Sequence, residues 1–130
     1  MKYVIVILSL ILLILAYNSN FFKSGFKFES YTETGRDTRL TEDLRKSHPV
    51  SSNGNVLKEK LERAGAKCSF YTKENFRNVL EGRNANSSWL CSYDSNNLSF
   101  KPLLHYKIWI FIGRDNNITF IESSVFRGFL

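Results

Sequence analysis

The stretch YKIWIFI, residues 106–112, is the strongest indication of the fold in this sequence. Its alternate positions are mostly apolar on both sides, and its isoleucine, tryptophan and phenylalanine are residue types that strands favour. The pattern predicts a central β-strand covered on both faces. The polar run GRDNN at 113–117 then predicts a hairpin turn, and ITFI at 118–121 predicts the returning strand.

Upstream of this hairpin, the pattern of apolar residues predicts a helix followed by two further strands. The helix is expected over residues 56–64, because apolar residues recur there at helical spacing. The sequence NGN at 53–55 provides residues that cap a helix, and Gly65 is a residue type that ends one. Strands are expected at 66–71 and 88–93, where the apolar and polar side chains alternate.

Two shorter segments complete the expected fold. A short helix is predicted over residues 72–82, and the apolar C-terminus at 125–130 is expected to pack back on the sheet. The predicted fold class is α+β: an N-terminal transmembrane or signal-anchor helix, then a small antiparallel sheet of three or four strands with one or two helices on one face.

The charged residues between the leader and the folded part indicate a tether. Residues 23–49 mix acidic and basic side chains closely and lack a sustained apolar period, although a short helix over 41–46 is expected within them. The predicted organisation is therefore a signal-anchor or transmembrane segment at 1–22, a polar tether at 23–49 and a small α+β domain at 50–130.

The N-terminal leader has no charged side chain over residues 3–22. As a helix it extends about 30 Å, the thickness of the hydrocarbon layer of a bilayer. One interpretation is a cleaved secretory signal that begins at Lys2. An uncleaved signal-anchor is favoured, because small residues do not occur at the spacing that cleavage requires. A buried core helix is disfavoured, since the segment has no polar face.

Either form of export places the folded part outside the cytoplasm, and we expect it at the periplasmic face of a bacterial inner membrane. The residues expected to contact lipid are Tyr3, Val4, Ile5, Val6, Ile7, Leu8, Leu10, Ile11, Leu12, Leu13, Ile14, Leu15, Ala16 and Tyr17. The net charge of +6 is spread along the chain among 12 acidic residues, which is typical of a solvated surface. We therefore expect no nucleic-acid partner.

The two cysteines, Cys68 and Cys91, lie in the two strands predicted upstream of the hairpin. Each shares a strand face with apolar residues, so both are expected to point inward. In an oxidising compartment a disulfide between them would stabilise the fold by about 3.4 kcal/mol. Two free buried thiols are the alternative, and a metal site is disfavoured because no histidine lies nearby.

The sequence contains no recognisable catalytic constellation. Its two histidines, His48 and His105, are read as a turn residue and a strand-edge residue, and His105 is the one base available to the domain if it were an enzyme. Motifs for nucleotide binding, zinc proteases and hydrolase nucleophiles are absent from the sequence. We expect no enzyme activity, cofactor, metal or small-molecule substrate.

Three stretches carry a resemblance to known proteins: residues 56–68, with the helix end LERAGAKC, then WLCSY at 89–93, then KIWIFI at 107–112. They resemble small exported, membrane-anchored bacterial proteins of uncharacterised function. The layout is also similar in outline to the SmpA/OmlA-type lipoproteins of the outer-membrane β-barrel assembly machinery. That resemblance implies helices against an antiparallel meander, and a protein that binds partners without catalysis.

The expected function is a non-catalytic, membrane-anchored envelope protein that serves as a protein-binding accessory module. Its expected partners are membrane lipid, through the N-terminal helix, and another envelope protein. The alternative is a periplasmic inhibitor or immunity-type protein that blocks a toxic or lytic enzyme. A disulfide-capable α+β domain without a catalytic set suits both functions.

Overall fold

The computed structural model describes residues 1–23, 25–72, 80, 82–95 and 103–128. Within them the chain is an α+β protein with an antiparallel sheet and three α-helices. The helices are α1 (Lys2–Lys23), α2 (Arg39–Ser47) and α3 (Gly54–Arg63), with the 3-10 turns η1 (Phe28–Ser30) and η2 (Arg114–Asn116). The strands are β1 (Gly35–Arg36), β2 (Lys67–Thr72), β3 (Ser87–Asp94), β4 (Leu103–Ile112) and β5 (Ile118–Gly128).

The five strands form one sheet in the order β1-β5-β4-β3-β2, and every neighbouring pair is antiparallel. The stretch at 106–112 lies in β4, the middle strand, as its apolar pattern predicts. The sheet has one strand more than the largest expected number, because the two residues of β1 pair with Val125 and Ser124 at the edge of β5. A pairing this short leaves no periodic signal in the sequence.

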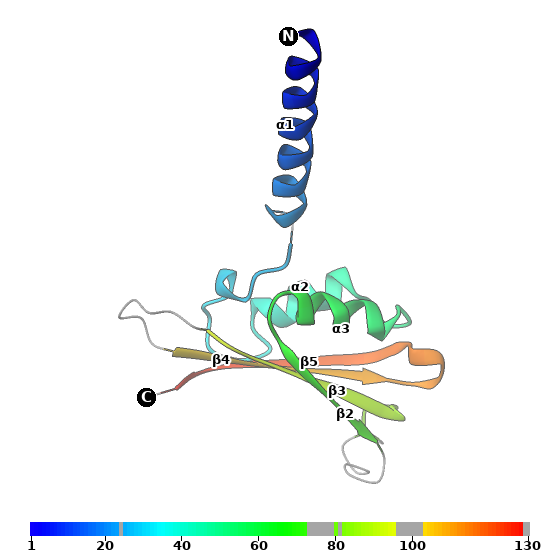
Figure 1. The fold of residues 1–130 in the computed structure, drawn as a ribbon. Coiled ribbons are helices and arrows are strands. Elements are labelled where there is room, and N and C mark those ends of the chain that lie inside the picture. The colour runs from blue at the N-terminus through cyan, green and yellow to red at the C-terminus, as the bar shows by residue number, and fades with distance from the viewer. Residues whose placement is uncertain (24, 73–79, 81, 96–102, 129–130) are drawn as a thin grey trace.

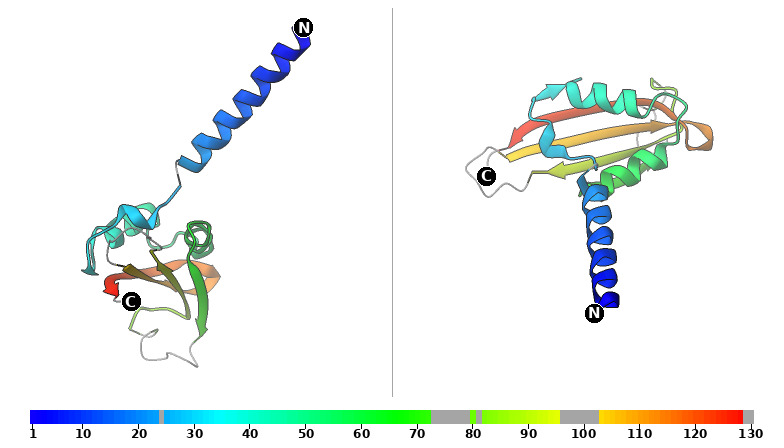
Figure 2. Two further views of the ribbon diagram at one scale, coloured as in Figure 1. Left: turned by 60° about the vertical axis from the view of Figure 1, so that its left-hand side comes forward. Right: turned by 90° about the horizontal axis from the view of Figure 1, so that it is seen from above.

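Helices α2 and α3 both lie on one face of the sheet, over different strands (Figures 1 and 2). Helix α2 packs against β5, whereas α3 packs against β2, β3 and β4. The core between the layers is apolar and fully buried. Its members include Leu40, Leu44, Leu57, Leu61, Tyr106, Ile108, Ile110, Ile121 and Val125.

Helix α3 begins and ends where the sequence predicts. The side chain of Asn53 accepts a hydrogen bond from the backbone N–H of Asn55 at 2.8 Å. Gly54 allows close packing on β4, because a Cβ atom there would lie 2.6 Å from the side chain of Ile112. Gly65, at φ +104°, ends the helix in the left-handed conformation that glycine adopts without strain.

The prediction that residues 23–49 form a polar tether is wrong. Phe28 and Leu40 are 0% exposed, Leu44 is 2% exposed, and all three belong to the core. Tyr106 donates its hydroxyl to the carbonyl of Tyr31 at 2.6 Å, which fixes the preceding segment to the sheet. The few apolar residues are spaced widely among charges, so they show no period, yet the domain begins near Phe26 and not at residue 50.

The hairpin of β4 and β5 is confirmed, with its turn at η2, where Asp115 and Asn116 have positive φ. Strand β5 is longer than expected, and residues 125–128 continue it instead of packing back as a separate segment. The short helix predicted over 72–82 falls largely outside the described residues.

Helix α1 extends away from the domain (Figure 1), and its apolar side chains between Tyr3 and Leu15 are 48–84% exposed. In the part of the chain that the structure describes, none of the helices is long and apolar enough to cross a membrane.

Candidate functional site

The face of the sheet opposite α2 and α3, which we call the open face, carries a group of large side chains. Because side chains alternate along a strand, the residues between the core positions point to this face. They include Lys67 and Tyr71 of β2, Leu90 and Asp94 of β3, His105, Lys107, Trp109 and Phe111 of β4, and Phe120, Glu122 and Phe126 of β5. Among the described residues, helix α3 contacts β4 on the core face, and Leu80 and Ala85 cover Phe111 on the open face.

Aromatic rings run across the strands of the open face. The ring centroid of Trp109 lies 5.6 Å from that of Tyr71 and 6.1 Å from that of Phe111, and the ring of Phe111 lies 6.4 Å from Phe120. Phe111 is buried beneath Leu80, whereas Trp109 and Phe120 are partly exposed. These contacts, between strands and along β4, restrict the orientations of the rings.

Arg83 extends over this aromatic band. Its guanidinium lies 4.9 Å from the ring centroid of Phe120 and forms an ion pair with Glu122. Its Nε atom is buried and has no hydrogen-bond partner within the described residues. A buried N–H that lacks an acceptor is costly, so a ligand with an acceptor at this position would bind favourably.

A pocket of about 230 Å³ opens beside Arg83. The residues that line it are Arg36, Asp37, Arg83, Trp109, Glu122, Ser123 and Ser124. It is smaller than the roughly 300–1,000 Å³ typical of small-molecule sites, and its lining is polar apart from the indole. Its size suits a single side chain of a partner better than a whole metabolite.

The open face has an excess of positive charge. Arg36, Lys67, Arg83 and Lys107 provide four cations among the described residues, against the two carboxylates of Asp94 and Glu122, which leaves an excess of two. Asp37, at the rim of the pocket, is already paired with Arg45 at 3.3 Å. The face therefore favours an acidic ligand.

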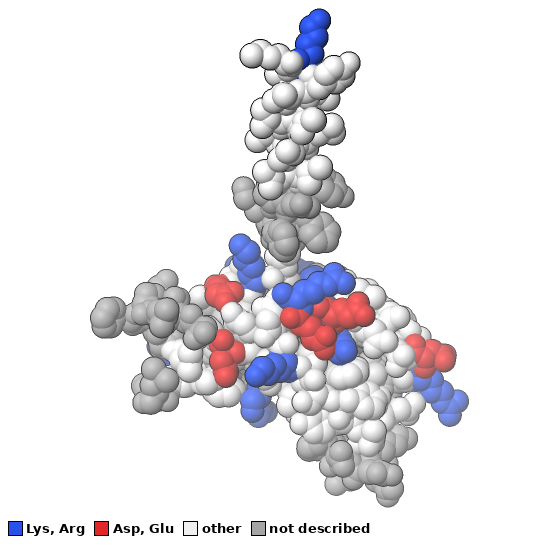
Figure 3. All heavy atoms as spheres, viewed as in Figure 1, with Lys and Arg blue, Asp and Glu red and all other residues white. Residues whose placement is uncertain are grey.

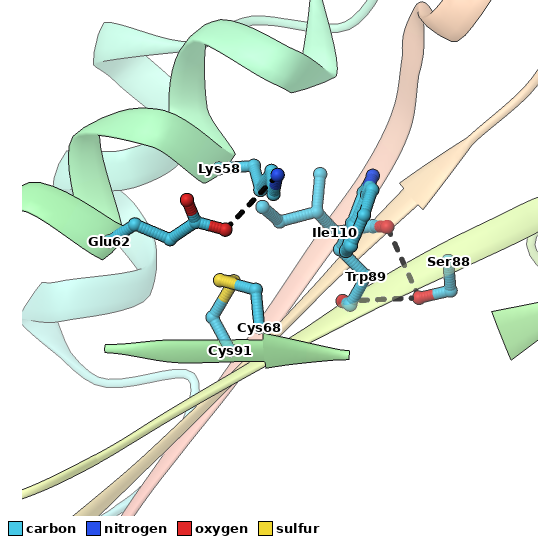
Figure 4. The surroundings of a disulfide bond; sticks show 7 residues. All are labelled: Lys58, Glu62, Cys68, Ser88, Trp89, Cys91 and Ile110. Atoms are coloured by element: carbon cyan, nitrogen blue, oxygen red, sulfur yellow. Dashed lines mark hydrogen bonds and ion pairs between the residues drawn. A yellow bond between two sulfur atoms is a disulfide. The ribbon is translucent and has the colours of Figure 1, made fainter. Parts of the chain in front are cut away.

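The structure brings Cys68 and Cys91 together as a disulfide, as the sequence predicts (Figure 4). The bond joins β2 to β3 beneath α3, below the ion pair that Lys58 makes with Glu62 at 3.1 Å. Cys91 is fully buried. The disulfide has a structural position, away from the open face.

The histidines lie far apart in the fold. His105, near the start of β4, contacts Asp94 through Nδ1 and stacks on Phe126. His48 follows α2, and burial, then the positive charge of Lys60, lowers its pKa. Within the described residues there is no cluster of three or more potential metal ligands.

The predicted lipid-contacting residues all lie in α1, although the side chains of Ala16 and Tyr17 are outside those the structure describes. The sequence predicted a strand at 106–112 covered on both sides, and the described residues cover the second side in part: Phe111 is buried beneath Leu80, whereas Trp109 is partly exposed. Lys107, within that run, was the signal of a solvent-facing side.

The chain matches no protein-family model, no curated protein and no solved structure. Its function must therefore be inferred from the site itself.

Proposed function

We propose that this protein is a non-catalytic, membrane-anchored binding module that presents its open face to an acidic partner protein outside the cytoplasm. The observation that carries the proposal is the asymmetry of the sheet. One face is covered by α2 and α3, while the other exposes aromatic rings, arginines and a pocket of about 230 Å³.

The chemistry of the open face suits a protein better than a small molecule. Tryptophan, tyrosine and arginine are the residue types that dominate binding energy at protein interfaces, especially around a small pocket that one side chain fills. Trp109 and Arg83 both border such a pocket. The positive excess would attract an acidic surface and raise the rate of association.

Membrane attachment is supported by the leader. The exposed apolar side chains at 3–15 would each favour transfer from water into lipid, and the stretch at 3–22 has no charged side chain that would oppose it. The disulfide supports an oxidising compartment, for which we propose the periplasmic face of a bacterial inner membrane.

Photo-crosslinking in membranes tests the interface. A photoreactive amino acid at Leu90, on the open face, should give an adduct with a second protein, whereas the same group at Val56, which is 56% exposed on α3, should not. Lys107→Glu should reduce the adduct at Leu90, and the matched change Lys46→Glu on α2 should leave it unchanged. Equal adducts at Leu90 and Val56 would contradict the proposal.

Thiol alkylation tests the compartment. In intact cells, Cys68 and Cys91 should resist a membrane-permeant maleimide until a reductant is added. Modification without reductant would place the thiols in a reducing compartment. If the crosslinked partner is a toxic or lytic enzyme that the full-length protein inhibits, the inhibitor alternative replaces the accessory role.

A further inference from the structure

The outer edge of β5 is covered in three places by other parts of the chain. Strand β1 pairs with Ser124 and Val125. Arg45 donates from Nε and Nη2 to the carbonyl of Ile121 at 3.0 and 2.8 Å. Further along, Ile118 exchanges two backbone hydrogen bonds of 2.8 Å with the segment at 51–52. Between residues 118 and 125, these contacts obstruct the approach of another strand.

The outer edge of β2 is different. The Cα atoms of Cys68 and Cys91 lie 4.0 Å apart, the close spacing of a pair that does not exchange backbone hydrogen bonds. Since bonding alternates along an antiparallel strand, the backbone N–H and C=O groups of Cys68, Phe70 and Thr72 point away from β3. No described residue forms a hydrogen bond with these outward groups.

Strand β2 also lacks the features that usually protect an edge. It contains no proline, its pairing with β3 is unbroken over six residues, and its one charge is Lys67 at its first position. Phe70 is 48% exposed beside Trp89, with the ring centroids 4.9 Å apart. The surface over β2 is largely uncharged below the charged side chains of α3 (Figure 3).

We propose that β2 pairs with β2 of a second copy of this chain, antiparallel and about a two-fold axis, so that the two sheets become one. With Phe70 opposite Phe70 of the second copy, the outward groups of residues 68, 70 and 72 meet those of 72, 70 and 68. Each copy then satisfies the backbone groups of the other, and the exposed rings of Phe70 cover one another.

The symmetry of this pairing favours a second copy over an unrelated peptide. A two-fold axis perpendicular to the sheet keeps both helical layers on one side and both open faces on the other. The N-terminal segments leave from the helical side, where Phe26 and Phe28 pack (Figure 1). This step rests on the proposed anchoring: both leaders enter the same membrane, and confinement there raises the effective concentration of partners.

The charges are compatible with self-pairing. Lys67 lies at one end of β2, so the two copies of Lys67 sit at opposite ends of the joint, about 20 Å apart at 3.3 Å per residue. Lys58, above the strand, is already paired with Glu62. Residues 68–72, which pair with one another in this register, include no charged side chain.

The mass of the full chain in detergent, measured by light scattering, tests the proposal through two substitutions at one position. Phe70→Pro removes an outward N–H but none of the hydrogen bonds to β3, so the fold is retained. Losing the two symmetry-related donors should weaken the dimer about thirtyfold, or about 2 kcal/mol. Phe70→Thr keeps the donor and removes the ring, so the dimer should weaken by about fivefold or less.

Circular dichroism and an intact Cys68–Cys91 bond establish that both variants are folded. A photoreactive group at residue 70 should also join two chains of 15.1 kDa, whereas one at Phe126 should not. A monomeric parent chain, or equal dimerisation of folded Phe70→Pro and the parent, would overturn the proposal. A crosslink from residue 70 to a different protein would assign this edge to another partner and overturn self-pairing as well.

Failure here is distinguishable from failure of the proposed function. Variants at Phe70 leave the open face intact, so adducts at Leu90 should persist in monomeric Phe70→Pro. Loss of the Leu90 adduct in a chain that still dimerises would instead reject the open-face interface.

Discussion

The two edges of the sheet are treated in opposite ways. The β5 edge is covered by β1, by Arg45 and by the segment at 51–52. The β2 edge is covered by no described residue, and a disulfide holds its strand to β3 instead. An unprotected strand edge can pair with other chains. Three separate contacts block such pairing along part of β5, whereas no described residue blocks it along β2. The proposed pairing of β2 depends on this difference.

The largest expected effect comes from removing the disulfide that joins β2, the strand at the uncovered edge, to β3. Combined Cys68→Ala and Cys91→Ala should lower the free energy of unfolding by about 3.4 kcal/mol, because the unfolded chain loses the constraint of its closed loop. Urea denaturation measures this loss. Ser69→Ala on the same strand is the control and should change stability by less than about 0.5 kcal/mol. Equal stability of the cysteine-free and parent proteins would show that β2 is held mainly by its backbone pairing.

The next effect concerns the covered edge. Leu44→Ala should cost about 3 kcal/mol, because Leu44 is 2% exposed where α2 packs on β5. Lys46→Ala, on the exposed side of the same helix, should change stability by no more than about 0.5 kcal/mol. Denaturation of the two variants side by side provides the measurement. Similar values for both would restore the interpretation of this region as a tether.

A smaller effect on stability is expected at Arg45, which covers the edge of β5 at Ile121. Arg45→Lys keeps the charge but not the paired donors to the carbonyl of Ile121, and should lower stability by about 1 kcal/mol. Arg39→Lys, whose ion pair with Asp43 spans 3.8 Å on the surface, is the matched control and should be nearly neutral. Thermal unfolding compares them. An unchanged midpoint for Arg45→Lys would mean that β1 and residues 51–52 suffice to cover this edge.

The smallest effect is a dependence on alkaline pH. Burial, followed by the hydrogen bond to Asp43, raises the pKa of Tyr31 to about 12, and the hydrogen bond to Glu29, followed by burial, raises the pKa of Tyr93 to about 12. Both phenols are favoured in the neutral form, so their contribution is intact below pH 10 and lost as pH rises toward 12. Tyr31→Phe should flatten the measured stability profile over that interval. A profile unchanged by this substitution would show that the phenol of Tyr31 titrates normally.

The elements that the sequence predicts well are those specified locally. Strand β4 and helix α3 have continuous periodic patterns, and Asn53 and Gly65 mark the ends of the helix by their own chemistry. The pairing of Cys68 with Cys91 follows from the strand faces that they share.

The elements that were missed depend on distant contacts. Strand β1 exists only because β5 lies beside it. Phe28, Leu40 and Leu44 enter the core one at a time from a charged segment, so no short window shows their role. The extent to which the open face is covered was not predictable, because an apolar strand looks alike whether a side is covered fully or in part.

The connection between α1 and the core has a consequence for reach. Helix α1 ends at Lys23, and Phe28 is already fully buried, so five residue steps at most separate them. Fully extended, these steps span no more than about 18 Å. If the protein is anchored as we propose, this short connection keeps the domain next to the bilayer surface. It meets only molecules that lie close to the lipid headgroups or extend to them, and a soluble protein deeper in the compartment must come to it.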